Sequence, residues 1–364
     1  MRVLVANAGS SSLKLSLLDE RDSELWRRDL DAPRAVVDAA AVSSALAELP
    51  EAPDAVGHRV VHGGDRFRAA VRLDAAVLAE LRDLTVLAPL HQPKSIAAIE
   101  AVERALPDVP SVACFDTSFH ASLPAAAATY ALPRDWRERY GIRRYGFHGL
   151  SHAYAARRAV QLAPGARRLV SCHLGAGASL CAVLDGRSVD TTMGFTPLEG
   201  LVMATRSGSV DPGLLLWLLQ RERVPIDAMA DALEHRSGLS GLAGTGEMRE
   251  LLERDDADAR LALDVYVHRL RAGIGAMVAA LGGLDVLVFT GGVGERSATV
   301  RERACAGLRH LGVAIAADVN AAAEDDAEIG PRGEGARVFV VRSREDVEIA
   351  AQARLLLSGQ PSAL

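Results

Sequence analysis

The sequence predicts an α/β fold made of two duplicated domains, and three observations support this prediction. The chain has 364 residues, more than the roughly 250–300 residues at which a single hydrophobic core stops growing. A strand, a turn of small residues and a second strand occur twice along the chain. Segments with helical spacing also alternate with strand-like runs, which is typical of α/β layering.

The first copy of the repeated hairpin opens the chain. A strand over Arg2–Ala6 leads through a turn of small residues into the alternating strand Leu13–Leu18. When Gly9 is aligned with Gly175, the segment Leu169–Leu184 repeats the same pattern. One hairpin in each half of the chain indicates an internal duplication.

A third glycine-rich element lies nearer the C-terminus, where the apolar run Val286–Phe289 leads through Thr290 into the turn Gly291–Glu295. Small residues in such turns let backbone N–H groups approach a ligand closely. One such turn alone is better explained as a tight hairpin without a ligand. All three turns in this order favour a phosphate site.

Helical spacing of apolar residues is found between the strand-like segments. The expected helices are Asp74–Leu84, Ser95–Leu106, Leu150–Gln161, Leu214–Arg221, Ala257–Ala280 and Val347–Leu357. We place the first α/β domain at residues 1–118 and 347–364, because the last helix is expected to pack back on it. The second α/β domain, residues 119–346, carries the expected nucleotide site.

The composition excludes several classes of protein. With 49% hydrophobic and 24% charged residues, the chain is globular and not disordered. A net charge of −6 without a basic run argues against a nucleic-acid partner, although a small anion needs only a few local positive groups. The longest charge-free run, 169–184, is too short and interrupted to span a membrane, and no signal-peptide core follows the N-terminus, so we expect a cytoplasmic protein. Four scattered cysteines predict buried thiols, with no disulfide and no zinc site.

Charged and imidazole side chains are concentrated in short motifs. Arg59 and Arg206 each lie in a glycine-rich, apolar setting, where a guanidinium needs an anionic partner. On chemistry alone, a structural ion pair explains each arginine as well as substrate binding does. His58, His62 and His152 are better explained as hydrogen-bonded core groups than as ligands.

Taken together, the motifs resemble the acetate kinase family of acetate and propionate kinases. The resemblance runs nearly from end to end, and its motifs are long and ordered, unlike a single GxGxxG. It rests on Asn7–Lys14, His58–Gly64, Leu87–His91, Phe115–His120, Tyr145–Gly149, Asp190–Gly200, Thr205–Gly208 and Phe289–Glu295. The family implies two duplicated domains of the actin and sugar-kinase type with a cleft between them, and a homodimer.

The resemblance also implies roles for individual residues. Arg59 and Arg206 would bracket the carboxylate and the phosphoryl group, because two fixed guanidiniums suit a transition state with charge on its equatorial oxygens. His148 would donate a hydrogen bond to that charge. The nucleotide and its phosphates would contact Asn7, Ser10, Ser12, Lys14, His173, Gly175, Gly177, Glu247, Arg249, Gly291, Gly292, Val293 and Gly294.

A metal site and an acyl pocket follow from the same resemblance. Asp116, expected to be catalytic, would hold Mg²⁺ with Asn7 and Glu345, directly or through water, and Mn²⁺ is an alternative ion. Magnesium favours such a site because it takes a few carboxylates together with substrate phosphates. The small apolar pocket for the acyl methyl group would consist of Val61, Phe147 and Pro197.

Some positions depart from the family pattern. Ala176 stands where the family has asparagine, so a polar side chain beside the nucleotide phosphates is missing. Arg344 adds a charge next to Glu345, and Glu247 replaces the usual aspartate. The first two departures bring the rate or the nucleotide affinity into question.

Acetate kinase activity is the favoured function, with reversible in-line transfer from ATP to acetate. The substrate carboxylate is itself the nucleophile, so the protein supplies positioning and charge stabilisation. Propionate or another short carboxylate is the alternative acceptor, because one methylene changes binding in a pocket by only about 1–3 kcal/mol. A nucleotide-binding protein without catalysis is a weaker alternative, motivated by Ala176 and Arg344.

Overall fold

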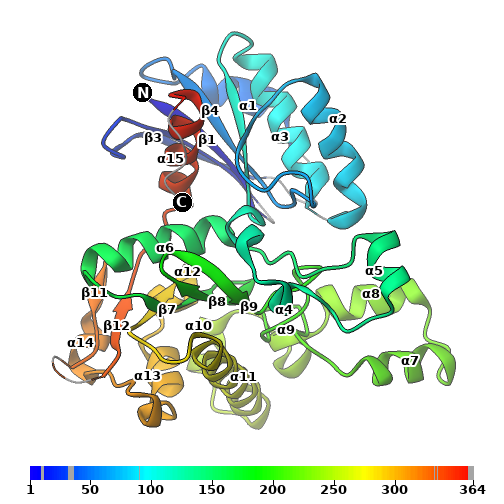
Figure 1. Ribbon diagram of the computed structural model, residues 1–364, viewed down its shortest axis with the longest axis vertical. Coiled ribbons are helices and arrows are strands. Elements are labelled where there is room, and N and C mark those ends of the chain that lie inside the picture. Colours follow the sequence, from blue (N-terminus) through cyan, green and yellow to red (C-terminus); the bar gives the residue numbers. More distant parts are fainter. Residues whose placement is uncertain (10–11, 32–36, 90, 332, 334, 360–364) are drawn as a thin grey trace. The chain divides into compact units, whose positions relative to one another are not determined.

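The computed structural model describes residues 1–9, 12–31, 37–89, 91–331, 333 and 335–359 (Figure 1). The chain forms two compact units. The first contains Met1–Ala121, Phe147–Tyr154 and Arg344–Leu364, and the second contains Ser122–Gly146 and Ala155–Ser343. Each unit is built on its own sheet.

The first unit has a six-stranded sheet with the order β3-β2-β1-β4-β6-β5. Strands β1, β4 and β6 are parallel, β2 and β3 continue from β1 as an antiparallel meander, and β5 is antiparallel to β6. The strands are β1 Val3–Ala8, β2 Ser12–Leu18, β3 Glu24–Asp31, β4 Ala55–Val60, β5 Val71–Arg72 and β6 Ser111–Phe115.

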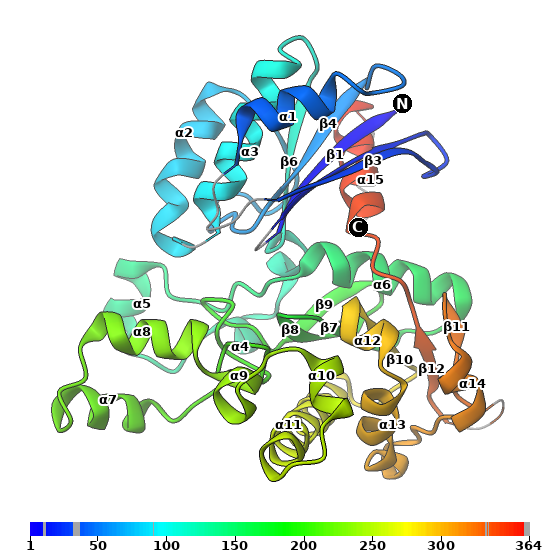
Figure 2. The same cartoon turned by 180° about the vertical axis from the view of Figure 1, so that it is seen from behind.

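Helices cover both faces of this sheet (Figures 1 and 2). Successive residues of a strand point to opposite faces, so Leu4 packs in the cluster of α1 and α3 while Val5 packs in that of α15. A Cβ atom on Gly57 would lie 2.5 Å from Ile349 Cγ2, so only glycine allows α15 to pack this closely on β4. The helices are α1 Ala39–Leu46, α2 Ala75–Asp83, α3 Gln92–Ala105 and α15 Glu345–Leu357, with short 3₁₀ segments η2 Leu84–Leu87 and η3 Ser118–Ser122.

The second unit repeats this sheet strand for strand. Its order is β11-β12-β10-β7-β8-β9, with β7, β10 and β12 parallel, an antiparallel β7-β8-β9 meander, and β11 antiparallel to β12. The strands are β7 Arg168–Leu174, β8 Ala178–Leu184, β9 Arg187–Thr191, β10 Val286–Thr290, β11 Ala327–Glu328 and β12 Arg337–Val340. The predicted α/β duplication is therefore confirmed.

All six predicted helices are present with boundaries shifted by a few residues. The longest helix, α11 (Ala257–Leu281), packs on β7, β8 and β9. At the start of this helix the Asp256 carboxylate accepts hydrogen bonds from the N–H groups of Asp258 and Ala259. The helix ends at Gly282, whose φ is 66°. The other helical segments are α4 Ala125–Ala128, α5 Arg134–Tyr140, α6 Gly149–Leu162, α7 Pro212–Gln220, α8 Ile226–His235, α9 Gly238–Ala243, α10 Met248–Glu253, α11 Ala257–Leu281, α12 Gly291–Arg296, α13 Ala298–Ala306, η4 Arg309–Leu311 and α14 Ala317–Ala322. None of the described helices has both the length and the apolarity needed to cross a membrane. The four cysteines are buried free thiols.

Candidate functional site

Four of the expected site residues meet at one edge of the first sheet. Asn7 lies near the end of β1, Arg59 near the end of β4, and Asp116 directly follows β6. Because these strands are parallel, their carboxyl ends lie at the same edge. Glu345, far away in the sequence, joins them as the first residue of α15.

The Arg59 guanidinium is the centre of this cluster. Its Nη2 lies 2.7 Å from Asp116 Oδ2 and its Nε 3.1 Å from Asp116 Oδ1, while Nη1 donates to Asn7 Oδ1 at 3.2 Å. Glu345 Oε2 lies 3.7 Å from Arg59 Nη1 and accepts a 2.8 Å hydrogen bond from Asn7 Nδ2. The ion pair that the sequence left open for Arg59 is therefore present, and it fixes the direction of the guanidinium.

The charges in this cluster do not balance. Burial alone would lower the pKa of Arg59, but the charges of Asp116 and Glu345 outweigh it and hold that pKa above its ordinary value. Two carboxylates face one guanidinium, and Asn7 adds an amide oxygen. Such oxygen donors fit Mg²⁺. The described part of the chain has no group of three or more His, Cys, Asp or Glu side chains that could hold a metal.

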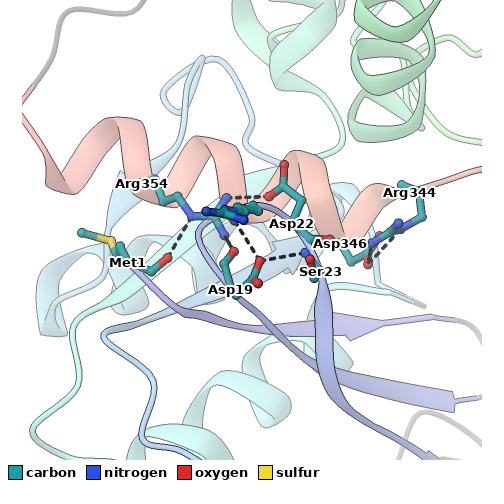
Figure 3. A network of polar contacts seen from close by, with 8 residues as sticks. Met1, Asp19, Asp22, Ser23, Arg344, Asp346 and Arg354 are labelled. Atoms are coloured by element: carbon teal, nitrogen blue, oxygen red, sulfur yellow. Dashed lines mark hydrogen bonds and ion pairs between the residues drawn. The ribbon is translucent and has the colours of Figure 1, made fainter.

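Arg344, the extra charge beside Glu345, is directed to other partners (Figure 3). Its Nε and Nη2 each lie 3.0 Å from an oxygen of Asp346, and Nη2 also lies 3.4 Å from the Asp22 carbonyl. Arg354, later in the same helix, donates to Asp22 Oδ1 at 2.6 Å. The two arginines thus attach α15 to the turn between β2 and β3, and the charge of Arg344 is neutralised by Asp346.

His148 adopts an unusual backbone conformation in the first unit. Its φ is 56°, in the left-handed region that residues with a Cβ atom seldom occupy. The next residue, Gly149, donates its N–H to the Asp116 carbonyl at 2.8 Å, and a Cβ atom there would lie 2.2 Å from that carbonyl oxygen. Strained residues are often found at active sites, and this one is tied to the backbone of Asp116.

Phe147, which precedes His148, is held by buried aromatic and imidazole rings. His120 Nε2 lies 3.0 Å from the Phe147 carbonyl, and the His62 ring meets the Phe147 ring edge-on at 5.4 Å. Burial lowers the pKa of His120 to about 4, so its ring is neutral and its Nε2 carries the proton donated to Phe147. Phe147 and Val61 are both buried. The prediction that His62 is a core group is confirmed, because its Nδ1 accepts the Gly64 N–H at 2.8 Å.

The second hairpin and the third glycine element lie side by side in the second unit. His173 is near the end of β7 and is the register partner of Thr290, the last residue of β10. In the hairpin turn, Gly175 N–H donates to the Gly177 carbonyl at 2.9 Å. Ala176 is exposed at the tip of this turn.

The glycine segment itself differs from the expected open turn, because Gly291–Gly294 form the first turn of helix α12. Gly291 has a φ of 79°, and a Cβ atom there would lie 2.8 Å from the Leu174 carbonyl oxygen. Only glycine therefore allows the chain to pass from β10 into helix α12 so close to the end of β7.

Arg206 in the second unit contrasts with Arg59. It is half-buried, and its Nη1 donates to the Pro197 carbonyl at 2.7 Å. No carboxylate among the described residues lies within ion-pair distance of it. Burial lowers its pKa and the charge of Glu234 partly offsets this, but an arginine stays protonated. The structural ion pair that the sequence left open for Arg206 is not found.

A polar cluster that the sequence did not single out supports the segment between Pro197 and Arg206. Glu199 accepts a hydrogen bond from Tyr130 and lies 2.9 Å from Arg144 Nη2. The Tyr130 oxygen also accepts the Phe195 N–H at 3.0 Å. Burial and the bond to Glu199 raise the pKa of Tyr130 to about 12. Glu199 lies in one of the motifs, but Tyr130 and Arg144 are too far away in sequence to be recognised.

The remaining predicted residues are exposed, half-buried or outside the described residues. Ser10 is outside the described residues, and Ser12 is half-buried at the start of β2. Lys14 is exposed. Glu247 is exposed at the N-cap position of α10, where its side chain makes no capping hydrogen bond, and Arg249 is exposed and lies 3.2 Å from Glu253.

Comparisons with known proteins give a consistent result. The model of the Acetokinase family matches residues 31–351. An acetate kinase of Gloeobacter violaceus is 43% identical over 97% of this chain and 98% of that protein, and one of Streptomyces coelicolor is 44% identical over 98% and 97%. The crystal structure of Porphyromonas gingivalis acetate kinase superposes with a TM-score of 0.89 at 34% identity, covering 98% of this chain and 99% of that one. A propionate kinase structure from Francisella tularensis gives 0.87 at 32% identity over the same shares.

Proposed function

Because this chain belongs to the acetokinase family, we propose that it is an acetate kinase, which transfers the γ-phosphoryl group of ATP reversibly to acetate. The observation that best supports this proposal is Arg206, a half-buried guanidinium bonded to the Pro197 carbonyl and to no carboxylate among the described residues. A cation kept in this state has its charge available for an anionic substrate.

In the proposed reaction, an acetate oxygen forms a bond to the γ-phosphorus while the bond from that phosphorus to the ADP oxygen breaks. No side chain becomes covalently attached. Arg59 and Arg206 stabilise the charge on the transferred group, and His148 donates a hydrogen bond to it. Asp116 fixes Arg59 through its forked ion pair, so the guanidinium does not need to reorganise during transfer.

Asp116, Glu345 and Asn7 would hold Mg²⁺ together with the ATP phosphates. The ion, when bound, would supply positive charge that offsets the negative charge of the phosphates. Asn7 has a second role, because its amide connects the Glu345 carboxylate to Arg59. The nucleotide phosphates would lie near Ser12, Lys14, the His173–Gly177 hairpin and Gly291–Gly294, with Ser10 as a further contact and Glu247 and Arg249 near the adenosine.

Trapping of acetyl phosphate with hydroxylamine tests the function directly. Purified protein with ATP, Mg²⁺ and acetate should form acetyl hydroxamate, and chelation of the metal should stop the reaction. A protein that binds ATP but forms no acyl hydroxamate with any carboxylate of two to four carbons would instead be a nucleotide-binding protein without catalysis.

The choice of acyl group depends on a small apolar pocket. We propose that Val61, Phe147 and Pro197 contact the methyl group. Val61→Ala removes two methyl groups from a buried position, so the ratio of kcat/KM for propionate over that for acetate should rise several-fold, by about 1 kcal/mol for one methylene. Val60→Ala, at the adjacent buried position, is the control. An unchanged ratio in Val61→Ala would show that Val61 does not line the pocket.

We also propose that the protein is a homodimer in the cytoplasm. Helix α7 supports the dimer, because it has no buried residue in this chain and its Leu216 and Trp217 are 54% and 49% exposed. An exposed apolar face of this kind marks a surface that another protein buries, and a second copy of this chain would bury it. The mass from light scattering should be that of a dimer, and Leu216→Glu should halve it. A monomeric wild-type protein, or a dimeric variant, would contradict the proposal for α7.

A further inference from the structure

Glu295 joins two backbone segments that belong to different parts of the proposed site. Its Oε1 accepts the N–H of Gly291 and the N–H of Ser343, both at 2.9 Å. Gly291 opens the glycine turn assigned to the nucleotide. Ser343 is the last residue of the second unit and stands two positions before Glu345, the carboxylate assigned to Mg²⁺. One oxygen of Glu295 thus accepts hydrogen bonds both from the segment assigned to the nucleotide and from the segment that leads to Glu345.

A buried arginine, Arg301, fixes the backbone of Glu295. Arg301, which is only 1% exposed, donates from Nη1 to the carbonyls of Gly294 at 2.9 Å and Glu295 at 2.6 Å. Its other contacts are to Asn320, whose side-chain oxygen accepts from Nε at 2.7 Å. This buried arginine therefore holds the end of α12, and the Glu295 side chain extends from a fixed backbone toward Gly291.

The segment before α15 is attached to the second unit at successive N–H groups. Val341 donates to the Phe289 carbonyl at 2.9 Å and Arg342 to Asp326 Oδ1 at 2.9 Å. Ser343 then donates to Glu295. Among these three, only the Ser343 bond leads to the glycine turn, and it is the last one before the chain enters the first unit.

We propose that Glu295 is a positioning residue that transmits occupation of the glycine turn to Ser343, and thereby to Glu345. This inference rests on the proposed function, because that function places the nucleotide at Gly291–Gly294. A hydrogen bond to a charged acceptor is short and directional, so a phosphate that draws the turn toward itself also moves the acceptor of Ser343. Nucleotide binding and the placement of the metal carboxylate are then coupled through a single side chain.

Amide hydrogen exchange of the full-length protein tests this coupling, with peptides that contain Gly291 and Ser343. Without ligand, Glu295→Ala should raise exchange at both positions about tenfold or more, because 1.4 kcal/mol of lost hydrogen bonding corresponds to a factor of ten. Glu295→Gln, which keeps an acceptor oxygen, should stay close to wild type. Arg296→Ala is the matched control, since the Arg296 Nε bonds the Gly292 carbonyl of the same helix, and this substitution should leave exchange at Ser343 in the ligand-free protein unchanged.

Addition of ATP with Mg²⁺, in the absence of acetate, completes the test. Slower exchange is expected at both peptides in the wild type and in Arg296→Ala, but only at the Gly291 peptide in Glu295→Ala. Wild-type protection at Ser343 in Glu295→Ala would overturn the inference. The inference would also be overturned if the wild-type protein made acetyl phosphate but exchange at the Ser343 peptide did not change on addition of ATP. In that case the proposed function would still stand. Coupled exchange at both peptides without any acetyl phosphate would support the coupling and contradict the function.

Discussion

Arg206→Ala should lower kcat by roughly 10²–10³-fold or more, because a preorganised donor to the transition-state charge typically contributes that much. The protein should remain folded. Among the residues that the structure describes, Arg206 has no carboxylate partner that its removal would leave unpaired. The lost bond to the Pro197 carbonyl is one interaction, with a net contribution of about 1 kcal/mol or somewhat more. Acetyl phosphate formation and thermal unfolding measure the two effects separately.

Arg158→Ala provides the control for Arg206. It removes a partly exposed arginine of the same unit, paired with Asp326 at 2.6 Å, and kcat should not change. Near-normal turnover of Arg206→Ala would remove this arginine from the proposed mechanism. Unfolding of Arg206→Ala alone would show that its bond to Pro197 is needed for the fold.

Arg59→Ala should abolish measurable turnover and also destabilise the protein, unlike Arg206→Ala. The substitution leaves the buried Asp116 carboxylate without its guanidinium, and breaking a buried pair in this way costs about 3–5 kcal/mol. Burial raises the pKa of a carboxyl that has lost its partner. The deficit in the free energy of unfolding should therefore shrink as the pH falls, because protonation removes the unpaired charge. Urea unfolding of the wild type and of Arg59→Ala at several pH values measures this difference in unfolding free energy.

The double variant Arg59→Ala with Asp116→Asn separates stability from chemistry. Removing the charge of Asp116 should recover a large part of the lost unfolding free energy, because Asp116 is the more deeply buried of the two carboxylates that lose their guanidinium, of which Glu345 alone stays charged. Turnover should stay absent, since both groups act in the proposed reaction. A double variant that regains turnover would mean that Arg59 and Asp116 serve only as a structural ion pair.

Three of the candidate residues lie at the ends of parallel strands, where the sequence pattern itself accounts for their clustering. Asn7, Arg59 and Asp116 follow buried apolar runs, and the hydrophobic pattern that identifies those strands also brings their carboxyl ends to one edge. The duplicated sheet was predictable for a related reason, because the repeated hairpin and the helical spacing are local patterns. The short helix that begins at Gly291 was not, since glycine favours turns and only the contact with Leu174 makes this geometry necessary.

The local pattern of apolar residues and glycines therefore determined the α/β class and the duplication, and the motifs that resemble the family supplied the candidate residues. The tertiary structure alone decided which charges are paired. Arg344 stands beside Glu345 in the sequence, but it is directed to Asp346 and Asp22, while Arg206 donates to the Pro197 carbonyl and pairs with no carboxylate of the described residues. Asp22 is 322 positions away from Arg344 in the chain, and Arg59 and Asp116 are 57 positions apart, so these contacts depend on how helices and loops pack. A sequence pattern with a period of two or 3.6 residues carries no record of such long-range contacts.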